Sequence, residues 1–260
     1  MAAKRNEHFK SLQGSLMIAR IVDGKRTTIR ELGNQTSVEL SVSTESTTIK
    51  ETKTGKRADA KILTTGRTVE LSATTNELVP ADVALAFGAE LISKGSTTVT
   101  DEAIATALEG ESIKLNGVNV SDLVITDSTG TPVTLVEGTN YTLDADYGVV
   151  TFKDLASFTT PLKASYTAGD ITVSEFFSMP DNAEYYVFFK GVDAFGGDPI
   201  SFELYRYSPK TDNSMQFINE EVGELTFGGT ALIMQDQVQA DGSLLDGYGR
   251  IINIIKTTTP

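Results

Sequence analysis

The segments "TSVELSVST" (residues 36–44) and "GRTVELSAT" (residues 66–74) decide the fold class, because each alternates apolar with polar side chains. In the first segment Val38 and Leu40 share one side of an extended chain, while Glu39 lies on the other side with serines. Side chains alternate with a period of two along a strand, so such a strand has one apolar and one solvated face. Both segments are therefore predicted to be antiparallel β-strands with a polar face in water.

Two later segments repeat this plan, "ISFELYRY" (residues 200–207) and "GELTFGG" (residues 223–229). In each of the four segments a glutamate stands on the side opposite to the apolar residues. A sheet with one side in water produces such a pattern generally, and a sheet lining a water-filled channel would produce it too. The sequence thus predicts a mainly β fold with four one-sided strands. Their glutamates are Glu39, Glu70, Glu203 and Glu224.

Turn residues mark two β-hairpins. The segment "GSLMIARIVDGKRTTIRELGNQ" (residues 14–35) reads as strand, Asp23–Gly24 turn and strand, since Asp and Gly tolerate the backbone angles of tight turns. The segment "EGTNYTLDADYGVVTFKD" (residues 137–154) has two short alternating runs around a polar, Asp-rich turn. We therefore expect a hairpin in both places.

Helical signals are limited to short stretches. Pro80 suits the first position of a helix, the chain after it is rich in Ala and Leu, and Gly88 is suited to end the helix. A short helix is predicted from Pro80 to Phe87, with its apolar side on the sheet. A second short helix is expected over Asp101–Glu109.

Composition divides the chain into an inserted and a flanking part. From about residue 93 to residue 170 Thr, Val, Asp and Gly predominate, and turn signals separate short strands. We expect residues 1–92 and 171–260 to form one β-sandwich domain, and residues 93–170 to form an inserted or elaborated small β module. Extra packing and a decoration or host-surface role are equal alternatives for this module.

The composition also excludes several classes of function. A formal net charge of −13 opposes a surface that grips nucleic acid, because phosphate binding requires clustered Lys and Arg. The chain has no cysteine, which removes disulfides, thiolate zinc sites and cysteine nucleophiles. No run approaches the roughly 20 apolar residues of a membrane span, and no secretion signal is visible. We therefore expect folding in a cytoplasm without membrane insertion.

Candidate catalytic residues are scarce. His8 is the only histidine and stands in a polar N-terminal segment. The adjacent acids Glu220 and Glu221 would point to opposite faces of a strand, so they are not expected to act as an acid–base pair. The segment "DADYG" (residues 144–148) departs from the calcium-loop pattern, because its glycine comes fifth and not sixth. The sequence predicts no enzyme, no metal site and no cofactor.

The segment "ESTTIKETKTGKRADAKILTT" (residues 45–65) joins the first two one-sided strands. It is far longer than the about two to five residues of a hairpin loop. Its cations outnumber its acids, although the protein as a whole is acidic. A long polar loop of this kind is either a contact with a neighbouring copy, made through complementary charge, or a solvated loop, and we favour the contact. The residues assigned to it are Lys50, Glu51, Lys53, Lys56 and Arg57.

The order of these pieces resembles that of the major tail tube proteins of long-tailed bacteriophages, of the non-contractile type. The resemblance covers roughly residues 14–256 and lies in the order of the motifs, not in any single one. The motifs are "ELGNQTSVELSV", "IKETKTGKRADAKI", "GRTVELSATTNEL", "VEGTNYTLDADYGVVTF", "DPISFELYRYSP" and "DGYGRIINI".

The resemblance implies a tail-tube-type β-sandwich or partial barrel with a short flanking helix. Four strands of each subunit would form an inner sheet that joins a ring-wide β-barrel. The subunits would assemble into hexameric rings, stacked into a hollow tube through which double-stranded DNA passes. The implied partners are further copies of the chain and the tape measure, tail tip and tail terminator proteins. The protein would be assembled in the host cytoplasm and end in the virion tail.

The resemblance also gives places to the residues singled out above. Glu39, Glu70, Glu203 and Glu224 would line the lumen, where negative charge discourages DNA from sticking. Residues 45–65 would stack one ring on the next, and the 93–170 module would project from the outer surface. Two other classes compete with this interpretation. An Ig-like bacterial surface or adhesion protein would have small Thr-rich β modules but also a secretion signal, and a carbohydrate-active β enzyme would have a carboxylate pair and aromatic platforms.

Overall fold

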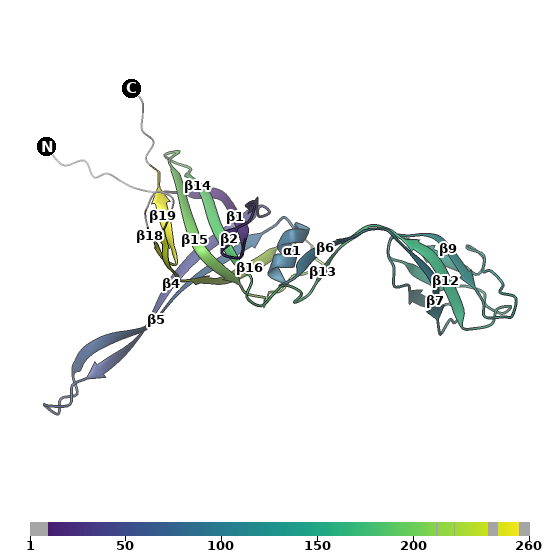
Figure 1. Ribbon diagram of the computed structural model, residues 1–260, viewed down its shortest axis with the longest axis horizontal. Coiled ribbons are helices and arrows are strands. Elements are labelled where there is room, and N and C mark those ends of the chain that lie inside the picture. Colours follow the sequence, from purple (N-terminus) through teal and green to yellow (C-terminus); the bar gives the residue numbers. More distant parts are fainter. Residues whose placement is uncertain (1–9, 212, 221, 239–243, 255–260) are drawn as a thin grey trace, which may run out of the picture. The chain divides into compact units, whose positions relative to one another are not determined.

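The computed structural model describes residues 10–211, 213–220, 222–238 and 244–254 and is mainly β (Figure 1). The chain forms two compact units. Unit 1 comprises residues 1–90 and 174–260, and unit 2 comprises residues 91–173. The strands of unit 1 are β1 (Leu12–Val22), β2 (Lys25–Arg26), β3 (Arg30–Glu31), β4 (Gln35–Lys50), β5 (Asp59–Thr75), β14 (Glu184–Asp193), β15 (Pro199–Pro209), β16 (Leu225–Leu232), β17 (Met234–Val238), β18 (Leu244–Gly247) and β19 (Gly249–Asn253).

Nine strands of unit 1 form one antiparallel sheet in the order β2-β1-β14-β15-β16-β5-β4, with β19 on β15 and β3 on β1. The predicted turn between β1 and β2 is confirmed, because Asp23 and Gly24 both have positive φ angles, 50° and 72°. The edge strands of this sheet do not pair with each other, so the sheet does not close into a barrel. Strands β17 and β18 form a separate two-stranded sheet.

The core of unit 1 lies on one side of this sheet. Tyr207 of β15 and Phe227 of β16 are almost fully buried there. Gly229 is required beside Tyr207, since a Cβ at this position would lie 2.5 Å from the tyrosine ring. The other buried residues of the cluster are Leu16, Ile18, Leu32, Val69, Leu71, Ala73, Leu85, Ala86, Val187, Leu204, Leu225 and Ala231.

The predicted short helix is present as α1 (Pro80–Ala86), with Pro80 in the first turn. It ends before Gly88, whose φ of 58° is the left-handed conformation that glycine adopts without strain. Asp82 of α1 is completely buried and accepts hydrogen bonds from the backbone N–H of Gly33 and from the guanidinium of Arg30. Because a buried carboxylate must be paired, this contact ties the helix to the segment that leads into β4.

Unit 2 has its own core. Its strands are β7 (Thr97–Ile104), β8 (Ser112–Lys114), β9 (Val120–Thr126), β10 (Tyr141–Asp144), β11 (Val149–Phe152) and β12 (Leu162–Ala168). They form two three-stranded sheets, β10-β11-β8 and β7-β12-β9. Buried Phe152, Ile125 and Tyr166 belong to a single apolar cluster. The predicted hairpin of residues 137–154 is confirmed by the pairing of β10 with β11.

The units divide inside a two-stranded sheet formed by β6 (Glu90–Lys94) and β13 (Ile171–Glu175). The limits of unit 2 are residues 91 and 173, where the sequence indicated 93 and 170. No helix in the described part of the chain is long and apolar enough to cross a membrane.

The predicted helix over Asp101–Glu109 is wrong. Residues up to Ile104 belong to strand β7, which pairs with β12. Strand β7 begins with the β-branched residues Thr97–Thr100. Asp101, which follows them, has a φ of 54°, an angle that does not occur in an α-helix. The alanines suggested a helix, but pairing with β12 decides the conformation, because tertiary contacts override a weak propensity.

The predicted 45–65 loop is also wrong in its extent. Strand β4 continues to Lys50 and β5 starts at Asp59, so only residues 51–58 connect them. The segment lacks clean alternation, but it is rich in Thr and Ile, which favour extended structure. A β-bulge where Glu45 is followed by Ser46 marks the start of a long hairpin. We call residues 46–64 the ribbon, and Figure 1 shows it projecting from the sheet of unit 1.

Candidate interaction surfaces

The four predicted one-sided strands are neighbours in the sheet of unit 1. They correspond to β15, β16, β5 and β4, which follow one another in this order. Leu40 pairs with Leu71 on the core side, whereas Glu39 stands opposite Ser72 and Glu70 stands opposite Ser41 on the other side. Side chains alternate along each strand, so Glu39 and Glu70 share the face turned away from the core. We call this side of the four strands the polar face.

The polar face is less open at β15 than the alternation predicts. A register shift in β15 places Leu204 and Tyr207 on the same core side, although they are three residues apart. Ser201 and Tyr205, expected in water, are each only 4% exposed. Glu203 does lie on the side opposite to Leu204, but its side chain is 13% exposed. Because these side chains of β15 are covered by other parts of the protein, β15 adds little to the area of the polar face that is exposed to solvent.

The predicted lumen glutamates differ in their surroundings. Glu70 forms an ion pair with Lys210 at 2.9 Å, and Glu203 forms one with Arg250 at 2.9 Å. Glu39 is exposed and has no ion pair among the described residues. Glu224 precedes β16 and lines a surface hollow together with Thr226. Because ion pairing compensates part of the negative charge, the face is less negative than the glutamates alone suggest.

The tip of the ribbon is an ordered turn with a cationic surface. Glu51 organises it by accepting hydrogen bonds from the hydroxyl and N–H of Thr54 and from the N–H of Lys53. These contacts, that of the Thr54 hydroxyl first, hold the pKa of the Glu51 carboxyl below its usual value. Lys50 and Asp59 close the base of the turn with a 2.8 Å ion pair. The remaining predicted contact residues, Lys53, Lys56 and Arg57, are exposed.

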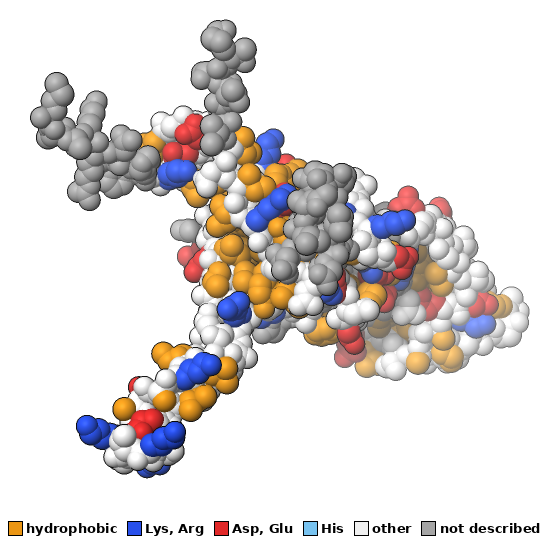
Figure 2. All heavy atoms as spheres, turned by 60° about the vertical axis from the view of Figure 1, so that its left-hand side comes forward, with side chains coloured by type: hydrophobic (Ala, Val, Ile, Leu, Met, Phe, Trp, Pro, Cys, Tyr) orange, Lys and Arg blue, Asp and Glu red, His pale blue; other side chains and the backbone are white. Residues whose placement is uncertain are grey.

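The shaft of the ribbon exposes apolar side chains on both faces. Ile49 and Leu63 lie on one face and are 48% and 50% exposed, and Ile62 lies on the other face and is 68% exposed. Figure 2 shows hydrophobic side chains along this projection and Lys and Arg at its end. A two-stranded hairpin in water is marginally stable by itself. The composition of the segment predicted a polar loop, and no alternation in its sequence indicated these exposed apolar side chains.

The sheet of unit 1 leaves long edges unpaired. Strand β4 has 16 residues and pairs with β5 on one side only. On the opposite flank of the sheet, β1 pairs with β2 and β3 only from Met17 to Val22. The two edges meet at one point, where the N–H of Leu16 donates a hydrogen bond to the Gln35 side chain at 2.8 Å. An edge of this length is a template for pairing with another chain.

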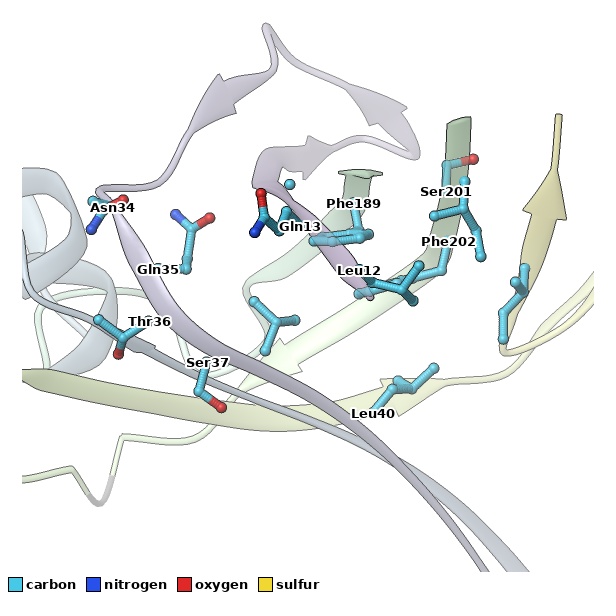
Figure 3. Close-up of a pocket in the computed structure, with 14 residues that line it drawn as sticks. Leu12, Gln13, Asn34, Gln35, Thr36, Ser37, Leu40, Phe189, Ser201 and Phe202 are labelled. Carbon is cyan, nitrogen blue, oxygen red and sulfur yellow. The ribbon is translucent and has the colours of Figure 1, made fainter. Parts of the chain in front are cut away.

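A groove opens where β1 and β4 separate, and we call it the β1–β4 groove (Figure 3). Its volume is about 620 Å³. Phe189 of β14 and Phe202 of β15 stack in it with ring centroids 5.2 Å apart, and Leu12 and Leu40 line its walls. None of its lining residues is charged, although one end is polar, with Gln13, Asn34 and Gln35. This composition suits the binding of apolar side chains and provides neither a general acid nor a general base.

Further apolar side chains are exposed in loops of unit 1. Phe176, Phe177, Phe195, Phe217 and Ile218 are between 67% and 93% exposed. Phe177 also has a positive φ of 57°, an unusual conformation for a bulky residue. Sequence reasoning missed these residues, because single aromatic residues in polar loops carry no periodic signal.

The acids that are buried have structural partners. Asp127 accepts hydrogen bonds from the N–H groups of Val133, Thr129 and Thr159, and Asp193 accepts from Ser11. No group of acidic or histidine side chains that could hold a metal ion occurs in the described part of the chain. His8 and Glu221, considered above for catalysis, lie outside the described residues.

Comparison with known proteins places the chain in a family but not in a functional class. The model of a family described as "Protein of unknown function UCP028589" matches residues 9–252. The chain belongs to this family. No curated protein matches the chain.

Proposed function

We propose that this member of the family is a structural, non-enzymatic virion protein that assembles into stacked hexameric rings, the tube of a bacteriophage tail. The proposal combines the sequence resemblance with the architecture of unit 1. The strands predicted to form an inner sheet are contiguous there, in the order β15-β16-β5-β4. Their sheet ends in an open edge, and ring formation would give that edge a partner.

The open edge of β4 is the observation that carries the proposal. It presents the backbone N–H and C=O groups of a 16-residue strand on the side that faces away from β5. Soluble proteins cover or shorten such edges because they cause uncontrolled association. Pairing with the next subunit in a closed ring satisfies the same groups and leaves no edge.

The dimensions of such a ring fit its proposed cargo. If the wall of the ring takes only β15, β16, β5 and β4 from the larger sheet of each of six subunits, it has 24 strands, which at about 4.8 Å spacing and 45° tilt is about 50 Å across. Side chains of roughly 5 Å would leave a channel of about 40 Å by the same geometry. Double-stranded DNA would pass through it, and Glu39, which is exposed and has no ion pair among the described residues, would face it.

The ribbon is the proposed contact between rings. Its basic tip, with Lys53, Lys56 and Arg57, is suited to meet an acidic surface on the next ring. The tape measure, tail tip and tail terminator proteins are the partners proposed for the two ends of the tube. The protein would assemble in the host cytoplasm and remain in the virion tail.

Electron microscopy of the purified protein tests the proposal. We expect rings or tubes at high protein concentration or after addition of a tail initiator complex, and end-on class averages would give the number of subunits. A protein that remains monomeric under all these conditions, including in infected-cell extracts, contradicts it.

The role of the ribbon tip has a separate test. We expect replacement of Glu51–Arg57 by a short Gly-Ser linker to leave the circular dichroism spectrum unchanged, since the tip contributes nothing to the core of unit 1. The variant should form rings but no long tubes. A matched control replaces the exposed turn residues Asp146–Tyr147 of unit 2 by Gly-Ser. Tubes of normal length from the tip variant would exclude the tip as the inter-ring contact.

An Ig-like bacterial surface or adhesion protein is the second candidate. The observation that favours it is unit 2, a compact β unit with two small sheets and a core of its own. This function predicts a monomer that binds intact bacterial cells, whereas the tube subunit predicts assemblies without such binding. A cell-binding assay with the monomeric protein separates the two.

A further inference from the structure

The β1–β4 groove is the place where the core of unit 1 remains open. Val38, Leu40, Phe189 and Phe202 pack against the buried cluster and at the same time line the groove. Leu12 and Ile251, also in its lining, are 50% and 65% exposed. Apolar surface of this kind is favourable to cover, at roughly 25 cal/mol for each Å² removed from water. An occupant therefore has to be apolar and narrow enough to fit between two strands.

The ribbon is two strands wide, and its shaft exposes Ile49, Ile62 and Leu63 among threonines and Lys61. It cannot enter the groove of its own chain. Strand β4 forms one wall of the groove with Val38 and Leu40 and continues to Lys50 in the ribbon, and it pairs with β5 from Gln35 onwards. Folding back would break this ladder. The occupant must then come from another copy.

We propose that the β1–β4 groove receives the ribbon of a second copy of the chain, with the apolar shaft packed on Phe189 and Phe202. This inference deepens the proposed function and rests on it, because it takes the two chains to be subunits of one assembly. The contact is heterologous, because the ribbon of one subunit binds a different surface, the groove, on its neighbour. Repetition of such a contact produces rings or filaments, not closed two-fold dimers.

The charges around the groove agree with this occupant. Its uncharged lining suits the shaft, and the cationic tip needs acids beyond the end of the groove. Leu12 in the groove stands opposite Asp193, where the turn between β14 and β15 begins. Asp193 accepts a hydrogen bond from the N–H of Ser11 and lies near Lys10, whereas Asp198 in the same turn is exposed. The tip therefore finds a carboxylate close to the groove.

Cysteine cross-linking tests the contact. The chain has no cysteine of its own, so only the introduced cysteines can form disulfides. Ile62→Cys and Leu12→Cys are made in separate chains, mixed under assembly conditions and oxidised. We expect a disulfide-linked heterodimer on non-reducing gels that neither variant gives alone. The control mixes Ile62→Cys with Val136→Cys, an exposed position in unit 2. Cross-linking of Ile62 with Leu12 that does not exceed the control overturns the proposal.

Microscopy of the same samples separates this result from the proposed function. Tubes without the Ile62–Leu12 cross-link would overturn the docking and leave the tube function standing. The cross-link without rings or tubes would support the docking and count against the tube.

A charge placed on the shaft gives a second measurement. Ile62→Asp should keep the circular dichroism spectrum, since this side chain is largely exposed in the single subunit. It should weaken self-association at least about ten-fold in sedimentation, because burial of an aliphatic side chain is lost. Val136→Asp is the matched control and should not weaken it. Equal effects of the two substitutions would contradict docking of the shaft.

Discussion

Units 1 and 2 solve the problem of sheet edges in opposite ways. In unit 2 no strand exceeds the eight residues of β7, and short strands leave short edges. In unit 1 β4 alone has 16 residues with one side unpaired. The same chain thus contains one unit with short unpaired sheet edges and one unit with a long unpaired edge.

Their apolar surfaces differ as well. Unit 2 gathers Phe152, Ile125 and Tyr166 into a core that its two sheets enclose. In unit 1 the core continues into the β1–β4 groove, and the ribbon carries isoleucine and leucine into solvent. A protein gains nothing by exposing these side chains unless a partner covers them. Unit 2 thus encloses its core between its own sheets, whereas the core of unit 1 stays open at the groove, which agrees with the proposed self-assembly of unit 1.

Excision of unit 2 should have the largest effect. Replacement of residues 93–170 by a Gly-Ser turn between β6 and β13 should remove one calorimetric transition. At about 0.7 kcal/mol per residue near 60 °C, some 80 residues correspond to roughly 55 kcal/mol of unfolding enthalpy. Unit 1 should keep its transition and its self-association. Loss of both transitions would show that the units depend on each other for folding.

Large-to-small substitutions in the two cores give the next largest effect. Phe152→Ala should destabilise unit 2 by about 3–5 kcal/mol, because it leaves a cavity at a site that is 1% exposed. Leu225→Ala, at a fully buried site, should cost unit 1 about 2–5 kcal/mol. Each should shift one transition in differential scanning calorimetry and leave the other in place. A joint shift of both transitions would contradict the division into units.

The sequence predicted more of the sheet than of its surroundings. Alternation identified β4, β5, β15 and β16 and placed Glu39 and Glu70 on one face, because a half-buried strand has to alternate. It failed at β15, where a register shift places Tyr207 on the core side and where Ser201 and Tyr205, predicted to be in water, are buried. A β-bulge changes the phase of all residues beyond it, and no composition signal announces it.

Other features could not be predicted, because they depend on contacts between distant segments. The ribbon has no buried face, so the alternation that reveals a strand is missing from it. The β1–β4 groove lies between β1 and β4, near the start of the chain, and β14, β15 and β19, much later in it, and only their packing leaves a space between them. The error at Asp101–Glu109 has the same cause, since β12 determines that β7 is a strand.

Lowering the pH should reduce the stability of unit 1, because it weakens the ion pair between Glu184 and Arg206. The effect should be smaller than that of the core substitutions. Two hydrogen bonds, at 2.7 and 2.5 Å, hold the Glu184 pKa below its ordinary value of 4.5. A lowered pKa means that the pair stabilises unit 1 above pH 4.5 and that this contribution is lost as the pH falls through the folded-state pKa. Since both side chains are partly exposed, we expect roughly 1 kcal/mol.

Glu184→Gln tests this contribution by urea denaturation at pH 7 and at pH 3. The substitution should lower the stability of unit 1 at pH 7 and have little effect at pH 3, where the wild-type carboxyl group is increasingly protonated. The transition of unit 2 should not respond, because Glu184 belongs to unit 1. An equal loss at both pH values would mean that the charge of Glu184 is not the cause.

The smallest effect distinguishes two glutamates of the same face, Glu39 and Glu203. Glu203→Gln removes the charge that pairs with Arg250 at a side chain only 13% exposed, so unit 1 should lose roughly 0.5 kcal/mol. Glu39→Gln removes an exposed charge without an ion pair and should stay within about 0.3 kcal/mol of the wild type. Urea midpoints of unit 1 measure both, with the unchanged transition of unit 2 as internal reference. Equal losses would mean that the polar face is uniformly open. The expected difference would mean that β15 is closed by its own chain and that the outer strands β4 and β5 present the solvated part of the face.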